Sequence, residues 1–96
     1  MRVKIAYTVA LDEVESETAE IMSRATTDID AAYQEVINVQ NQLDTGTGDI
    51  EKNIEAIHFA RIKLAKADQI LEDCHLILQG LKETKAKLKE QQNEVQ

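Results

Sequence analysis

Apolar residues recur along most of the chain at intervals of three and four, the period of an α-helix with one buried face. In the first half the recurring positions are Met22, Ala25, Ile29, Ala32, Val36, Val39 and Leu43. In the second half they are Ile57, Ala60, Leu64, Ala67, Leu71, Cys74, Leu78 and Leu81. Both rows alternate steps of three and four, as the seam of a coiled coil or antiparallel bundle does. The pattern predicts helices over residues 12–44 and 50–90.

The segment between these helices, residues 45–49, carries glycine, threonine and aspartate, which end one helix and cap the next. A phosphate-binding loop is the alternative, but such a loop follows a strand and usually has a lysine nearby. Here Asp44 and Asp49 stand at the edges of the segment instead. The fold class is therefore predicted to be mainly α, with an antiparallel two-helix hairpin in a single domain.

Residues 2–11 alternate with a period of two, which predicts an N-terminal β-strand. Its apolar face carries Val3, Ile5, Tyr7, Val9 and Leu11. A lone strand leaves its backbone groups unpaired unless another strand meets it, and the nearest candidate is the same strand of a second copy. We therefore expect a homo-oligomer, a dimer or higher, with strand pairing between chains. Packing of the strand on its own helices is the alternative.

The second predicted helix has a second apolar row beside its seam, and the two rows together cover a wider arc than one partner helix needs. A second hairpin, giving a four-helix bundle, is the simplest way to cover it. The residues predicted to form the oligomer interface are Val3, Ile5, Val9, Phe59, Ile70 and Ile77.

Charge is distributed unevenly over the 96 residues, whose formal net charge is −7. Residues 12–20 hold five acids and no base, whereas residues 82–89 hold four lysines and one glutamate. Folding the chain at the turn brings these unlike ends together, although exposed pairs stabilise by only about 0–1 kcal/mol each. The polar residues 91–96 are expected to fray.

Composition excludes several functional classes. The single cysteine, Cys74, cannot form an intrachain disulfide, and no apolar run approaches the roughly 20 residues that span a bilayer. The negative charge disfavours direct binding to nucleic acid or to an anionic membrane. We expect a cytoplasmic protein.

Candidate chemistry is sparse. Glu72 and His75 have the spacing of di-iron bundle ligands, but Glu72 lies off the seam and the seam of the first helix holds no carboxylate. Cys74 sits on the seam, as an inert core thiol does. His58 and His75 lie on different faces of the predicted helix. We therefore expect no enzymatic activity, no metal and no cofactor.

Cations beside the strand suggest one binding site. Arg2 and Lys4 lie on its polar face, and strand pairing would gather them near the interface, with Arg61 or Lys63. Such a cluster suits a small anionic ligand such as a nucleotide, with Tyr7 available for stacking. An ordinary solvated strand face is the simpler interpretation.

Four segments, Val3–Val9, Leu11–Val14, Leu71–Cys74 and Ile77–Gly80, resemble small uncharacterised proteins of tailed bacteriophages, which are short, acidic and rich in helix. Those proteins commonly have proline after the Glu-Val pair, where this chain has Glu15. The resemblance implies a viral origin and a location in the cytoplasm of the bacterial host. It assigns no functional residues.

Two functional hypotheses follow. In the first, a phage-encoded binding protein antagonises a host process, such as antiviral defence, by sequestering a protein or a small anionic signal at an oligomer interface. In the second, a structural or adaptor subunit acts only through helix–helix contacts. A third, an acidic mimic of nucleic acid, fits less well because the charge outside residues 12–20 is mixed.

Overall fold

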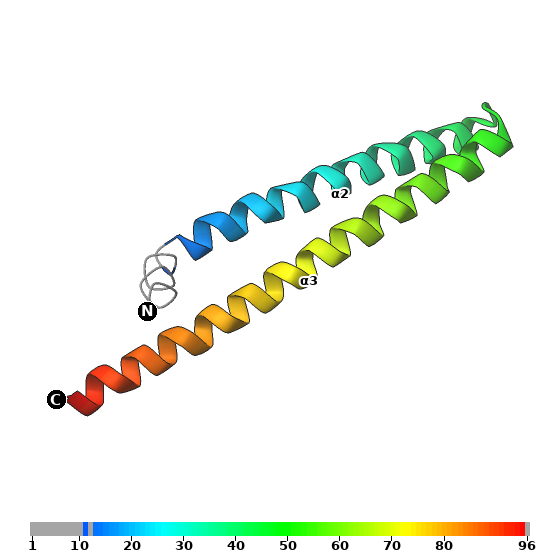
Figure 1. Cartoon of the computed structure of the whole chain (residues 1–96). Coiled ribbons are helices and arrows are strands. Elements are labelled where there is room, and N and C mark those ends of the chain that lie inside the picture. The colour runs from blue at the N-terminus through cyan, green and yellow to red at the C-terminus, as the bar shows by residue number, and fades with distance from the viewer. Residues whose placement is uncertain (1–10, 12, 96) are drawn as a thin grey trace.

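The structure, a computed structural model, describes Leu11 and residues 13–95, with side chains described as far as residue 91. This part of the chain forms two long helices, α2 (Val14–Thr45) and α3 (Ile50–Val95), which run antiparallel as a hairpin (Figure 1). The molecule measures 71 × 24 × 15 Å, and its radius of gyration of 21.1 Å exceeds the roughly 13 Å of a compact domain of this length. The predicted helical hairpin is confirmed, and it is a rod.

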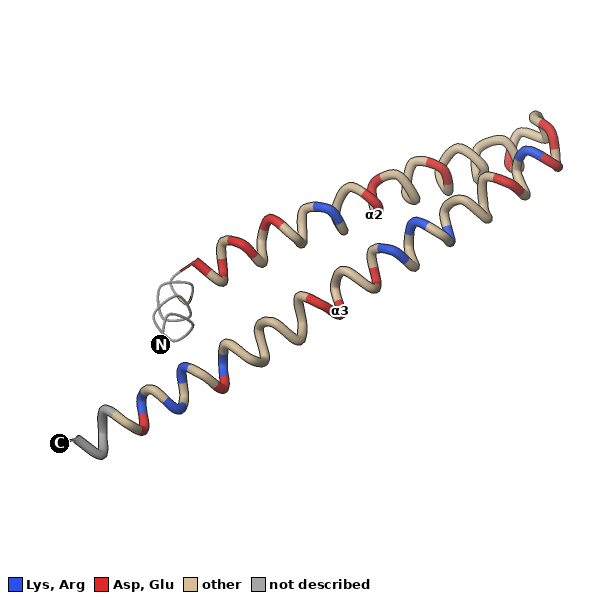
Figure 2. The backbone as a smooth tube through the Cα atoms, in the orientation of Figure 1, with Lys and Arg blue, Asp and Glu red and all other residues tan. Residues whose placement is uncertain are grey.

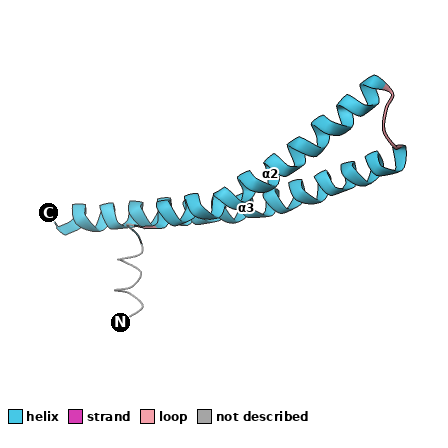
Figure 3. Ribbon diagram, turned by 90° about the horizontal axis from the view of Figure 1, so that it is seen from above, coloured by secondary structure: helices cyan, strands magenta, loops and turns pink. Residues whose placement is uncertain are grey.

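The two helices twist around each other along the rod. Near the turn they lie apart in the view from above, whereas towards the open end they overlap in that view and lie apart in the side view (Figures 1 and 3). This is the geometry expected when a strict seven-residue repeat keeps one seam of each helix against the other.

The turn between the helices is closed by hydrogen bonds at both of its ends. Gly46 follows α2 with a φ of 69°, in the left-handed region, and the Thr47 N–H then donates to the Gln42 carbonyl at 2.9 Å. At the start of α3 the Glu51 N–H donates to the Asp49 carboxylate at 2.9 Å. The segment is a helix–helix turn, as its residues predicted.

Substituting two glycines, one in the turn and one within α3, tests the backbone conformation at each position. Gly46→Ala places a Cβ at a φ of 69°, so we expect the free energy of unfolding to fall by about 1 kcal/mol. Gly80 lies within α3 with no atom within 4 Å of the position of an added Cβ, so Gly80→Ala is expected to raise it by about 0.5–1 kcal/mol. Urea denaturation followed by circular dichroism, at one protein concentration, measures both. Shifts in the same direction would contradict the expectation.

The helices meet along a seam of mostly small side chains that recur every seven residues. The buried positions are Thr18, Ala25, Ala32 and Val39 on α2 and Asn53, Ala60, Ala67, Cys74 and Leu81 on α3. The Cys74 thiol donates to the Thr18 carbonyl at 3.9 Å, which sets the register. Stepping seven residues along each helix from that contact brings alanine level with alanine, as the pairs Ala25–Ala67 and Ala32–Ala60. Methyl groups of this size let the helix axes approach to the lower end of the usual range of about 8–10 Å.

The prediction that both whole apolar rows form the seam is wrong for about half of their members. The small members of the predicted rows are buried, as expected, but most of the large members are not. Eight large side chains are 37–60% exposed: Met22, Ile29, Val36 and Leu43 on α2, with Ile57, Leu64, Leu71 and Leu78 on α3. They are termed the apolar face below. The cause is the close approach at the alanines, which turns the side chains four residues further on towards the flank of the seam.

The start of α2 differs from the prediction. The helix begins at Val14 with Glu13 before it, and no side chain caps it. Residue 12, where the helix was predicted to begin, and residues 2–10 of the predicted strand lie outside the described residues. Leu11, where the strand was expected to end, is helical.

The end of α3 also differs. The helix continues to Val95, past the predicted end at residue 90, so residues 91–95 are helical where the sequence predicted a frayed tail. The cause is local, because residues 82–91 are mostly lysine, glutamate, glutamine, alanine and leucine, which are strong helix formers, and hold no glycine or proline.

Candidate functional site

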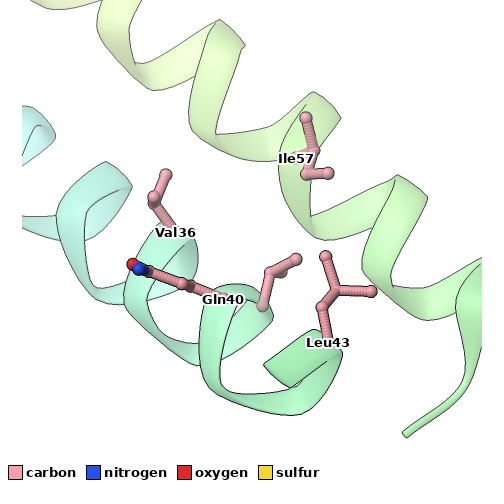
Figure 4. A pocket seen from close by; sticks show the side chains of 5 residues that line it. Val36, Gln40, Leu43 and Ile57 are labelled. Atoms are coloured by element: carbon pink, nitrogen blue, oxygen red, sulfur yellow. The ribbon is translucent and has the colours of Figure 1, made fainter. Parts of the chain in front are cut away.

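The apolar face is continuous across both helices. Val36 and Leu43 of α2 share one open groove of about 260 Å³ with Ile57 of α3. In Figure 4 Val36 and Leu43 extend towards α3, and Gln40 is a further residue that lines the groove. Each member of the face lies four residues from a buried seam position, so the same arrangement repeats at each level. The hairpin therefore presents one long apolar strip to which both helices contribute.

The opposite flank of the seam is closed within the hairpin. The Lys63 Nζ lies 3.6 Å from the Asp28 Oδ1, and the two side chains are only 27% and 17% exposed. The same ammonium lies 5.4 Å from the centre of the Phe59 ring, in cation–π geometry. The side chains on one flank of the seam thus contact one another within the hairpin, whereas the apolar side chains on the other flank are exposed.

The second apolar row predicted for the oligomer interface does not make up the open face. Ile70 and Ile77 are half-buried, because each lies three residues after a seam alanine or cysteine and turns towards α2 on the closed flank. Phe59 is exposed beneath Lys63. The other predicted interface residues, Val3, Ile5 and Val9, lie outside the described residues.

The residues predicted to bind an anion are not brought together in the described part of the chain. Arg61 and Lys63 are two residues apart on α3, so their side chains leave the helix about 200° apart. Arg61 lines a shallow depression on the outer side of α3, whereas Lys63 is engaged with Asp28. Arg2, Lys4 and Tyr7 lie outside the described residues.

The reactive side chains are placed as structural or surface residues. Cys74 is 1% exposed, packed in the seam, as its position in the apolar row predicted. Glu72 and His75 are exposed on α3. Among the described residues no three histidine, cysteine or acidic side chains are grouped so that they could hold a metal ion. Neither described helix contains a stretch that is long and apolar enough to cross a membrane.

Charge marks one end of the apolar face. Acidic residues crowd the first turns of α2, and lysines follow one another at the end of α3 (Figure 2). The Lys85 Nζ lies 3.0 Å from the Glu15 Oε1, and both side chains are exposed, so the predicted pairing of unlike ends is seen here. Glu15 and Lys85 stand seven residues beyond Met22 and Leu78, at the next level of the face. The face therefore ends in an ion pair at the open end of the hairpin.

The sequence contained a signal for the apolar face that periodicity alone does not use. Over most of each predicted row, from Met22 to Val36 and from Ile57 to Leu78, small and large residues alternate, so that small side chains recur every seven residues and large ones recur four residues after them. Two helices that pack on the small residues must leave the large ones at the flank. Over that stretch residue size, rather than hydrophobicity, distinguishes the two sets. At its ends Val39 and Leu81 are buried although Val36 and Leu78, of the same residue types, are exposed.

Comparison with known proteins found no match: no family model, no curated protein and no solved structure is similar to the chain. The geometry of the hairpin is therefore the basis for a proposal about its function.

Proposed function

We propose that the chain is a non-enzymatic protein that works by helix-to-helix contact with a protein partner along its apolar face. The observation that carries this proposal is the continuous strip of half-exposed leucine, isoleucine, valine and methionine side chains supplied by both helices. Single exposed apolar residues are normal on protein surfaces, whereas contiguous apolar strips mark interaction sites.

The spacing of the face defines the chemistry of the partner. Its members recur every seven residues on each helix, so the matching surface is an α-helix with apolar side chains at the same interval. At about 1.5 Å per residue, the rows from Met22 to Leu43 and from Ile57 to Leu78 each extend for roughly 32 Å. The partner must therefore present several helical turns rather than a short motif.

Both of the functional hypotheses use such a contact. A host-directed binding protein would sequester a helical segment of its target there, and a structural or adaptor subunit would assemble through it. The resemblance to bacteriophage proteins supports the first, in which the contact antagonises a host process. The version with a small anionic ligand draws no support from Arg61 and Lys63, which lie on opposite sides of α3.

Site-specific photo-crosslinking tests the contact. A photoreactive amino acid replaces Leu64 on the apolar face or, as the matched control, Ile62 on the outer side of α3. The two positions are 47% and 44% exposed and are two residues apart, so they differ in direction and hardly in accessibility. Irradiation of producing cells is expected to give covalent protein adducts from position 64, at least about tenfold more than from position 62, with the linked peptide in a helical segment that has apolar residues every three or four positions.

The outcomes are separable. Adducts that map to such a segment support the proposal. Equal yields from both positions, or no protein adduct from position 64, would overturn it, because a face that works by contact must be covered in the cell.

A further inference from the structure

The apolar face is flanked on α2 by an exposed, uncharged outer row, and this points to its occupant. We propose that a second copy of the chain packs on it, so that two hairpins form a four-helix bundle with both apolar faces in its centre. This inference rests on the proposed function, since it names the partner at the same surface. Of the two functional hypotheses it fits the structural subunit, because a face buried against a second copy cannot also bind a host target. It places the interface on the large residues of the two predicted seams rather than on the row of Phe59, Ile70 and Ile77.

Exposed area supports a partner of this size. The chain exposes 7969 Å², whereas a compact monomer of 10.8 kDa exposes about 5,500 Å². The excess over the whole rod, roughly 2,400 Å², leaves room for the ~800 Å² that each partner contributes to a standard interface. A second hairpin of equal length covers the face along both of its helices.

The position of the face around α2 matches a four-helix bundle. If a buried seam residue of α2 points directly at α3, the apolar-face residue four positions later points about 40° to one side of it, measured around the axis of α2. In a square bundle the second neighbour lies about 90° from the first, so these side chains point at the centre. The next row outward, at about 100°, would then face the second neighbour of α2. Its members are Ala19, Thr26, Tyr33 and Gln40, all exposed and none charged.

A lone foreign helix in the groove would contact the face but leave this uncharged outer row of α2 in water. A second copy also brings a face with the same seven-residue repeat and the same length, as a two-fold contact requires.

The mass of the protein in solution tests the inference. Light scattering and sedimentation equilibrium at micromolar concentration are expected to give twice the chain mass of 10.8 kDa for the wild type. Leu64→Glu puts an unpaired carboxylate into the centre of the bundle from each copy, so the dissociation constant is expected to rise at least about a hundredfold. Ile62→Glu, on the outer side of α3, is the matched control and should stay dimeric.

Leu64→Gln, which adds no charge, replaces the glutamate variant if circular dichroism shows that the latter has lost its helices. A wild-type mass of 10.8 kDa at every concentration, or equal dissociation of the position 64 and position 62 variants, would overturn the inference. Photo-crosslinking from position 64 distinguishes failure of the four-helix bundle from failure of the proposed function. Adducts with a different helical protein and none with a second copy would refute the bundle but keep the contact, and no adduct would refute both.

Discussion

Ala60→Leu is expected to lower the free energy of unfolding by about 1–3 kcal/mol, because the seam has no room for a larger side chain. Ala60 is 2% exposed and stands level with Ala32 on the facing helix. The added carbons must push the helices apart, and the neighbouring seam contacts loosen with them. Thermal denaturation followed by circular dichroism at one protein concentration measures the effect, as a fall in Tm of about 4–8 °C for each kcal/mol.

Ala65→Leu is the matched control. Ala65 is exposed on the outer side of α3, and alanine and leucine are both strong helix formers, so this change is expected to stay within about 0.5 kcal/mol of the wild type. The difference between the two variants therefore reports packing and not helix propensity. A leucine at position 60 that is tolerated as well as one at position 65 would show that the helices do not meet at the alanines.

The hairpin itself follows from local signals that act within a few residues. Repeats of three and four residues predict both helices, Gly46 and Asp49 predict the turn, and the unlike charges of the chain ends agree with the antiparallel direction. These signals suffice because a short turn brings two long amphipathic helices side by side, and their apolar faces can then pack only in an antiparallel pair.

The division of the apolar row into an inner and an outer half did not follow from periodicity. Ala25 and Ile29 are four residues apart and belong to the same predicted row, yet Ala25 is buried and Ile29 is exposed. Hydrophobic spacing defines an apolar stripe about 100° wide or more, whereas the difference between these two residues is one of about 40° around the helix axis. Over most of each row, the size of the facing side chains decides which half meets the other helix.

The candidate binding residues were harder to place for a related reason. Arg61 and Lys63 are neighbours in the sequence but leave α3 on opposite sides, and Lys63 is held by Asp28 on the other helix. Such a pairing depends on the register of the two helices, which the seven-residue repeat leaves open by whole heptads. The Cys74–Thr18 contact fixes it in the structure.

The Tm of the wild-type protein is expected to rise with protein concentration, because the hairpin alone buries little apolar surface. Four of the nine buried side chains in the described part of the chain are alanine, and each of those contributes little more than one methyl group, about 0.8 kcal/mol. Ordering the backbone costs about 1–2 kcal/mol for every residue fixed. Covering the apolar face adds up to about 1.5–3 kcal/mol for each large side chain that becomes fully buried. We therefore expect folding to be coupled to the proposed association of two copies, in which case mass action makes Tm depend on concentration.

Circular dichroism melts over a hundredfold range of protein concentration measure this coupling. The wild type should lose helix on dilution and melt at lower temperature, by roughly 10 °C across the range for an association-coupled domain of this size. Leu64→Gln should melt lower than the wild type at every concentration, whereas Ile62→Gln, the same change on the outer side of α3, should follow the wild type. A wild-type Tm that stays constant over the range, with full helix content in the most dilute sample, would show that the small-residue seam alone holds the hairpin and that the apolar face makes no contribution to its folding.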